Sequence, residues 1–235
     1  MSDALLDLQR LDTTTQQLTH RRSHLDQRQA LLEAQAEQAR QQTEIDAVAA
    51  ARVEVATRQR RFEDEAQIVS DKADADDARL YGGEVTAIKD LEALQSEIAG
   101  LRARQSDFED QVLEAMEEAE DLAARITALE AARAEVDGVI AGLEAEIAEA
   151  EAEIDAELAQ VATERDGVAG GVDGALIAEY ERRRPAFGAA TVVRFDGSGC
   201  SGCPSAMPAM EVDRIKHLDG TDPADCEECG RIVLR

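Results

Sequence analysis

Apolar residues recur every seven positions through residues 84–166, in two interleaved series. One series runs from Leu91 to Val161, and the other starts three residues later at Leu94 and ends at Glu157. The intervening positions are mostly Glu, Asp, Arg and Ala, which are solvated and favour helix. Two interleaved series sustained over about ten heptads are typical of a coiled-coil seam. The pattern therefore predicts one long helix whose seam faces a partner helix.

A second helical stretch is predicted over residues 3–80, with a less regular seam. Its leucines are seven apart, but the seam positions beside them are partly polar. The register shifts between about Ala39 and Ile45, and such a discontinuity locally changes supercoiling. The leucine series consists of Leu11, Leu18, Leu25 and Leu32.

Paired glycines separate the two helical stretches at Tyr81-Gly82-Gly83-Glu84. Two stretches of similar length on either side of a strong breaker predict an antiparallel hairpin in a monomeric chain, with its turn at 81–84 and arms of ~115 Å. The alternative is a parallel two-chain coil, since Ile and Leu alternate over 122–154 as parallel dimers prefer. A hairpin folded about this turn would bring residue i near residue 165 − i, and so place Arg22 near Leu143 and Arg28 near Asp137.

The composition agrees with extended helices rather than with a conventional globular core. The 235 residues include two Tyr, four Phe and no Trp, so smaller aliphatic side chains must supply the buried surface. The formal net charge is −26, of which residues 81–170 contribute −18, and such a surface repels nucleic acids and anionic membranes at long range. Neither a membrane span nor a signal peptide is predicted, so we expect a cytoplasmic protein.

A glycine-rich segment, residues 167–174, ends the second arm. It leads into a predicted short helix over Ala175–Arg184, with Asp173 as its N-cap and Pro185 as its end. The end of this helix carries the only basic run near the cysteines. The run would either contact a phosphate group or a partner, or neutralise the acidic base of the arm and the helix C-terminus, and we favour the second alternative. Its members are Arg182, Arg183 and Arg184.

All four cysteines follow residue 199 and form two Cys-x-x-Cys pairs separated by 22 residues. Four thiolates presented by two tight turns are typical of a structural Zn²⁺ site that leaves no open position for catalysis. A redox pair would need a βαβ pattern that neither pair has, and free thiols would leave a small module with almost no core. Strands are expected at Thr191–Phe195 and Ile232–Leu234. The expected ligands of one Zn²⁺ are Cys200, Cys203, Cys226 and Cys229.

These elements predict an all-α, long antiparallel coiled-coil hairpin followed by a small C-terminal β zinc ribbon. The expected domains are the hairpin over residues 1–169, the neck over 170–189 and the C4-type ribbon over 190–235. The neck glycines are expected to separate the core of the hairpin from that of the ribbon.

Short motifs at the hairpin tip, the neck and the ribbon follow one another in a distinctive order. They are Leu80–Val85, Lys89–Ile98, Phe108–Asp110, Met116–Glu117, Leu176, Tyr180–Arg182, Cys200, Gly202, Cys203, Cys226 and Cys229–Ile232. With this order and spacing, nearly the whole chain resembles a bacterial family, with chlamydial and helicobacter members, that joins a coiled-coil hairpin to a C4-type zinc ribbon. The resemblance implies a non-enzymatic regulator, because family members have been linked to an alternative sigma factor and to RNA, and the ribbon is described as nucleic-acid-binding.

The charge of this chain favours a protein partner over a nucleic acid. The ribbon loop is less basic than other versions in the family at Pro204–Pro208 and Leu218–Asp225, and zinc with four thiolates would take the ribbon from −3 to −5. We expect an adaptor for transcription or RNA-handling machinery, with direct nucleic-acid binding by the ribbon and the arginine run as the alternative. The sequence contains no recognisable acid–base set, nucleophile elbow or phosphate loop, so we do not expect an enzyme. The expected partner-binding residues are Lys89, Glu92 and Gln95, which lie off the seam beside the tip, together with Arg182, Arg183 and Arg184.

Overall fold

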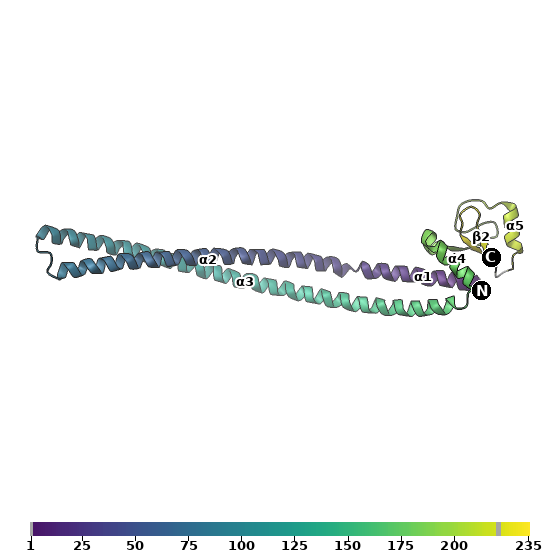
Figure 1. Ribbon diagram of the computed structural model, residues 1–235, viewed down its shortest axis with the longest axis horizontal. Coiled ribbons are helices and arrows are strands. Elements are labelled where there is room, and N and C mark those ends of the chain that lie inside the picture. Colours follow the sequence, from purple (N-terminus) through teal and green to yellow (C-terminus); the bar gives the residue numbers. More distant parts are fainter. Residues whose placement is uncertain (1, 220–221) are drawn as a thin grey trace. The chain divides into compact units, whose positions relative to one another are not determined.

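The computed structural model describes residues 2–219 and 222–235, and most of them are helical (Figure 1). Two long helices form a hairpin, and short strands with four clustered cysteines follow at the C-terminal end, so the expected fold class is confirmed. Within the described ranges, none of the helices combines the length and the apolarity that crossing a membrane requires. The elements are α1 (Ser2–Ser23), α2 (Asp26–Tyr81), α3 (Ile88–Ala169), α4 (Gly174–Phe187), the 3-10 helix η1 (Gly188–Ala190), β1 (Val192–Arg194), α5 (Ala209–His217), β2 (Ala224–Asp225) and β3 (Ile232–Leu234).

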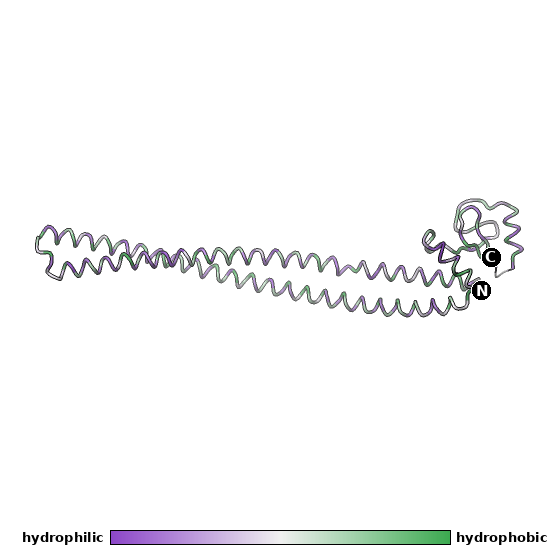
Figure 2. The backbone as a smooth tube through the Cα atoms, in the orientation of Figure 1, coloured by the Kyte–Doolittle hydropathy of each residue, from purple (hydrophilic) through white to green (hydrophobic). Residues whose placement is uncertain are grey.

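The predicted heptad seam of α3 is buried or half-buried at every position except Glu157, the last member of the second series. Figure 2 shows apolar and polar residues alternating along both long helices. Side chains of α2 and α3 pair within the chain, as where Lys72 Nζ donates to Glu97 at 2.8 Å and Gln38 Nε2 donates to Asp137 at 2.6 Å. The seam is therefore satisfied by an intrachain hairpin rather than by a parallel two-chain coil.

The pairing of the two arms is displaced from the predicted rule. The numbers of paired residues sum to 169 at Lys72–Glu97 and to 177 at Arg22–Asp155, instead of 165. The connection is longer than the predicted turn, because α2 ends at Tyr81 and α3 begins only at Ile88. Gly83, at φ +80°, takes the left-handed conformation that lets the chain reverse, and the residues after it remain outside the helix.

The first arm is interrupted at His24–Leu25, between α1 and α2, and runs without a break through the predicted shift at Ala39–Ile45. The His24 amide still donates to His20 O and Arg21 O, and Leu25 lies outside both helices. The apolar stripe changes register after the interruption. As a result, Leu32 is 61% exposed, although it was expected in the seam, while Ile45 and Val48 are buried.

The described residues form two compact units. One contains Ala30–Gly142, and the other contains Met1–Gln29 together with Leu143–Arg235. The second unit thus includes the bases of both arms, the neck and residues 190–235, which we call the terminal module.

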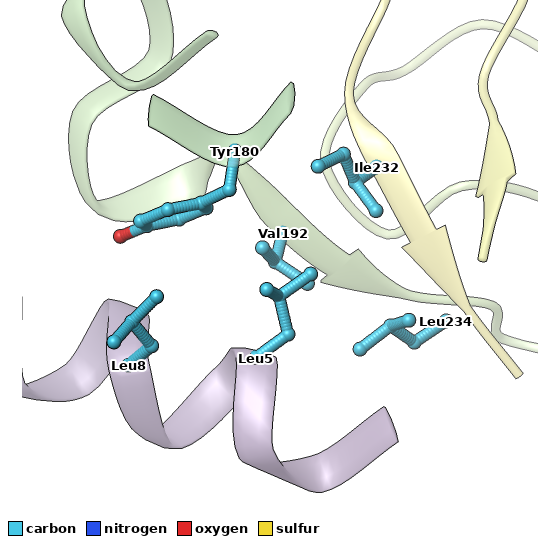
Figure 3. Packing of buried hydrophobic residues seen from close by; sticks show 6 residues of the cluster. All are labelled: Leu5, Leu8, Tyr180, Val192, Ile232 and Leu234. Carbon is cyan, nitrogen blue, oxygen red and sulfur yellow. The ribbon is translucent and has the colours of Figure 1, made fainter. Parts of the chain in front are cut away.

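The core of the second unit is shared between helix α1 and the terminal module. Figure 3 shows Leu5 and Leu8 projecting from α1 toward Val192 of β1 and Leu234 of β3, with Tyr180 of α4 beside them. All of these side chains are at most 1% exposed. The expectation that the neck separates two cores is therefore wrong, because α1 supplies apolar surface that so small a module cannot supply by itself.

The terminal module contains a three-stranded sheet in the order β1-β3-β2, which confirms the two predicted strands. Strands β1 and β3 are parallel, and β2 runs antiparallel to β3. The free edge of β1 is covered by Gln9 of α1. Its Nε2 donates to Val192 O at 2.9 Å, and Val192 N donates to its Oε1 at 2.6 Å. This buried amide completes the edge as a neighbouring strand would.

Helix α4 begins as predicted, since the Asp173 carboxylate accepts hydrogen bonds from the amides of Ala175 and Leu176. Its predicted end is wrong, because the helix continues through Pro185 to Phe187. A proline in the last turn removes only one amide donor, and Gly188, at φ +54°, then ends the helix by donating its amide to Arg184 O.

Candidate metal centre

Two tight turns present the four cysteines. The first turn is closed by the Cys203 amide, which donates to Cys200 O at 3.5 Å. Just before it, the Asp196 carboxylate accepts hydrogen bonds from the amides of Ser198 and Gly199. In the second, Gly230 at φ +74° donates its amide to Cys226 O at 2.8 Å. Each turn brings the two sulfurs of its pair to the same side, as the Cys-x-x-Cys spacing requires.

The four sulfur atoms lie within 4.8 Å of one another, with Cys200 Sγ 3.8 Å from Cys229 Sγ and Cys203 Sγ 3.9 Å from Cys226 Sγ. All four thiols are free, since a disulfide would bring two sulfurs to about 2.05 Å. A tetrahedral ion with metal–sulfur bonds of about 2.3 Å separates its ligands by about 3.8 Å. The donor set therefore fits one metal ion, and the predicted ligands are brought together.

The surroundings of the cluster shift the pKa values of its thiols in opposite directions. Burial raises the pKa of the Cys200 thiol to about 12. Burial acts in the same direction on Cys229, but hydrogen bonds from the backbone and side chain of Arg231, followed by those from neighbouring cysteines, outweigh it and lower the pKa of this thiol to about 7. The buried Nε of Arg231 has no hydrogen-bond partner among the described residues. A metal bound by four thiolates would supply the missing negative charge.

Position 202 in the first cysteine turn leaves no room for a side chain unless its neighbours move. A Cβ at this position would lie 2.7 Å from Arg231 Cδ and 2.8 Å from Val193 Cγ1. The Arg231 guanidinium also packs over the ring of Phe187, with its Cζ 4.9 Å from the ring centroid. Arg231 is thus fixed between the first cysteine turn and the end of α4.

The predicted arginine run of α4 is engaged within the chain. Arg182 pairs with Glu179, which lies one turn earlier. Arg183 Nη1 donates to Asp225 at 2.8 Å and to Gly230 O at 2.9 Å, and Arg184 lies 3.0 Å from Asp12. These contacts match the alternative in which the run neutralises acidic groups and joins α4 to its neighbours.

The predicted tip residues lie far from the cysteines in the sequence and belong to the other unit. Lys89, Glu92 and Gln95 are exposed on the first turns of α3, whereas Leu94 beside them is buried in the seam. The three side chains have no ion pair or hydrogen bond within residues 2–219 and 222–235, so they remain available to a partner.

A buried polar network around Asp12 is absent from the sequence predictions. Tyr180 Oη donates to Asp12 at 2.8 Å, and Arg165 Nε donates to the same carboxylate at 2.7 Å. Burial alone would raise the pKa of Asp12, but the hydrogen bonds from Arg165 and Tyr180 more than offset it and hold the pKa below its usual value. The only sequence signal was the interruption of the apolar stripe of α1 by Gln9 and Asp12.

Comparisons with known proteins agree with this fold. Two strains of Mycobacterium tuberculosis, CDC 1551 and H37Rv, each have an uncharacterised protein that is 33% identical to this chain over 236 residues, covering 99% of this chain and 94% of theirs. A solved structure from Mycobacterium smegmatis superposes with a TM-score of 0.83 at 27% identity and covers 100% of this chain and 97% of its own. The structure of CT398 from Chlamydia trachomatis gives a TM-score of 0.68 at 20% identity, with 99% and 97% covered, and this likeness shows the fold alone.

A family model also matches most of the chain. The model describes a CT398-like coiled coil hairpin domain and matches residues 8–188, which include both arms, the turn and the neck. The match ends before the first cysteine, so the metal centre rests on the geometry of the four sulfurs. The chain belongs to the family of CT398-like coiled coil hairpin domains.

Proposed function

We propose that this protein is a non-enzymatic adaptor in gene expression, which holds one structural Zn²⁺ in its terminal module and binds a protein partner through the hairpin tip and that module. Zinc is the metal that most commonly takes four thiolates in a tetrahedral structural site. Cys200, Cys203, Cys226 and Cys229 would fill its coordination sphere and leave no position for a reacting water.

The observation that carries the proposal is the exposed surface at the hairpin tip. Tyr81 is 83% exposed and Ile88 is 74% exposed, and they flank the turn between α2 and α3. Beside them stand Lys89, Glu92 and Gln95, which the seam does not use. An exposed aromatic and aliphatic pair with polar neighbours has the composition of a protein–protein contact.

Direct nucleic-acid binding is the weaker alternative. It would need the arginine run of α4, but Arg183 and Arg184 already pair with Asp225 and Asp12. The formal net charge of −26 adds long-range repulsion of phosphates.

The test is affinity capture with the tagged full-length protein, with and without nuclease. The tip variant changes Lys89, Glu92 and Gln95 to Ala together, and a matched control changes the exposed Arg104, Glu114 and Gln160 of the same helix to Ala. We expect a nuclease-resistant partner that the control retains and the tip variant loses.

Two results would contradict the proposal. Partners that disappear after nuclease treatment would favour nucleic-acid binding. A partner retained equally by the tip variant, but lost by Cys226→Ser, would move the contact from the tip to the terminal module.

A further inference from the structure

An arginine-rich segment of α2 departs from the acidic character of the chain. Residues 52–61 contain four arginines and a single acidic residue, Glu54, in a protein with a net charge of −26. Most other arginines of the hairpin have an ion-pair partner, such as Arg125 with Glu44 or Arg102 with Asp74. In contrast, three members of this segment have no ion pair in the described part of the chain. They are Arg52, Arg60 and Arg61.

The segment lies beside a groove with an apolar floor. One hollow of about 320 Å³ is lined by Ala49, Ala56 and Ile126, together with Arg52 and Val53. A neighbouring hollow of about 370 Å³ shares Val53 and is otherwise lined by polar side chains, those of Glu54, Thr57, Arg58 and Arg61. Val53 itself is 66% exposed and stands between the two hollows.

Arginines line the rim of this groove. Arg52 belongs to the first hollow, and Arg58 and Arg61 line the second. Positions 52 and 61 are nine residues apart on α2, so the rim extends over ~14 Å, between two and three helical turns. Guanidinium groups bind carboxylates with defined geometry, and an exposed valine between them offers an apolar anchor.

We propose that this surface, which we call the arginine groove (Ala49, Arg52, Val53, Ala56, Arg61 and Ile126), is the docking site for an acidic amphipathic helix of the protein partner. The apolar face of that helix would cover Val53 and enter the hollow over Ala49, Ala56 and Ile126. Its carboxylates would pair with Arg52 and Arg61. This inference rests on the proposed adaptor function and adds the chemistry of the partner.

Charge and geometry favour a short acidic helix over a nucleic acid. Carboxylates of α3 border the arginines, since Glu118 pairs with Arg58 and Glu120 lines a hollow with Arg52. An extended polyanion lying along the groove would be repelled by these carboxylates. A short helix can instead position its own carboxylates so that they pair only with the arginines. The apolar floor also gives a phosphate backbone nothing to bind.

The probe is a fluorescent synthetic peptide with the sequence of residues 140–157, which carries seven carboxylates and no basic residue on an amphipathic pattern. Fluorescence anisotropy would measure its binding to the full chain at low and physiological salt. A scrambled peptide of equal composition controls for charge alone. We expect micromolar binding of the amphipathic peptide and at least tenfold weaker binding of the scrambled one.

Variants locate the contact. Changing Arg52, Arg60 and Arg61 together to Glu should weaken binding at least tenfold. Val53→Ser should weaken it about threefold to tenfold, through loss of the apolar anchor alone. The matched control changes the exposed Arg10, Arg40 and Arg104 to Glu, which alters the net charge equally and should leave binding within about twofold of wild type.

Several outcomes would refute the arginine groove as a docking site without affecting the proposed contact at the hairpin tip. These are no binding of the peptide to wild type at 100 µM (~−5.5 kcal/mol), equal effects of the two triple variants, or equal binding of the scrambled peptide. Tighter binding of a 20-nucleotide single-stranded RNA than of the peptide would do the same. Sedimentation showing a dimer that the groove variant abolishes would assign the surface to a second copy of this chain. Loss of the captured partner by the tip variant tests the adaptor separately.

Discussion

Replacing Gln9 by methionine tests whether α1 and the terminal module form one cooperative body. Methionine has nearly the length and volume of glutamine, so it fills the same space with little packing change. It removes both hydrogen bonds to Val192. These are the bond that Gln9 Nε2 donates to Val192 O at 2.9 Å and the bond that Val192 N donates to Gln9 Oε1 at 2.6 Å. The edge of β1 would then be buried without partners, because Val192 is 1% exposed.

The expected loss follows from these two backbone groups. Each buried amide or carbonyl left unpaired costs about 1–3 kcal/mol. Gln9→Met should therefore reduce the free energy of unfolding of this unit by ~2–6 kcal/mol, which lowers the ratio of folded to unfolded protein at least roughly 30-fold. Gln17→Met is the matched control, because Gln17 is exposed on the same helix, and its effect should stay within about 0.5 kcal/mol.

Urea unfolding followed by tyrosine fluorescence measures the effect. The chain has two tyrosines and no tryptophan, so a Tyr81→Phe background leaves the buried Tyr180 as the only reporter of this unit. Hydrogen exchange at the Val192 amide gives an independent measure, with protection expected to fall at least about 30-fold. If Gln9→Met has the same midpoint and the same exchange as Gln17→Met, then the amide does not hold the sheet edge and the reasoning is refuted.

Three further changes test the metal centre and the buried network. Elemental analysis should find about one zinc per chain. Cys226→Ser should lose the zinc together with part of the helical circular dichroism signal, because the terminal module shares its core with α1. An unchanged helical signal in this variant would contradict the shared core. Gly202→Ala should destabilise the module by about 1–3 kcal/mol and speed the release of zinc to a chelator, since the new Cβ would lie 2.7 Å from Arg231 Cδ, whereas Gly199→Ala should not. The depressed pKa of Asp12 means that its contribution to stability is complete above about pH 4 and is lost as the pH falls through the folded-state pKa. In Asp12→Asn, urea unfolding at a series of pH values should show a weaker loss of stability in acid. The same pH dependence in wild type and variant would refute the role given to Asp12.

The long periodic elements were predictable because a heptad repeat is a local property of the sequence. The seam of α3 and the two cysteine turns follow from spacings of seven, three and four residues, which any window of the chain contains. The interruption at His24–Leu25 is not predicted, because neither a glycine nor a proline marks it in the sequence. The polar residues at Ala39–Ile45 suggested a shift, but the seam of α2 tolerates half-buried glutamines there, such as Gln41.

The two helical arms, the glycine connection and each of the two cysteine turns can be predicted from the sequence, since each depends on residues a few positions apart. The offset between the arms, the meeting of the two cysteine turns across a 22-residue loop and the union of α1 with the terminal module become visible only in the folded chain. The hydrogen bonds of Gln9 with Val192 and of Tyr180 with Asp12 join residues 183 and 168 positions apart. No local periodicity encodes such distances, because those pairs depend on both ends of the chain lying in one unit, where the small sheet takes part of its core from α1.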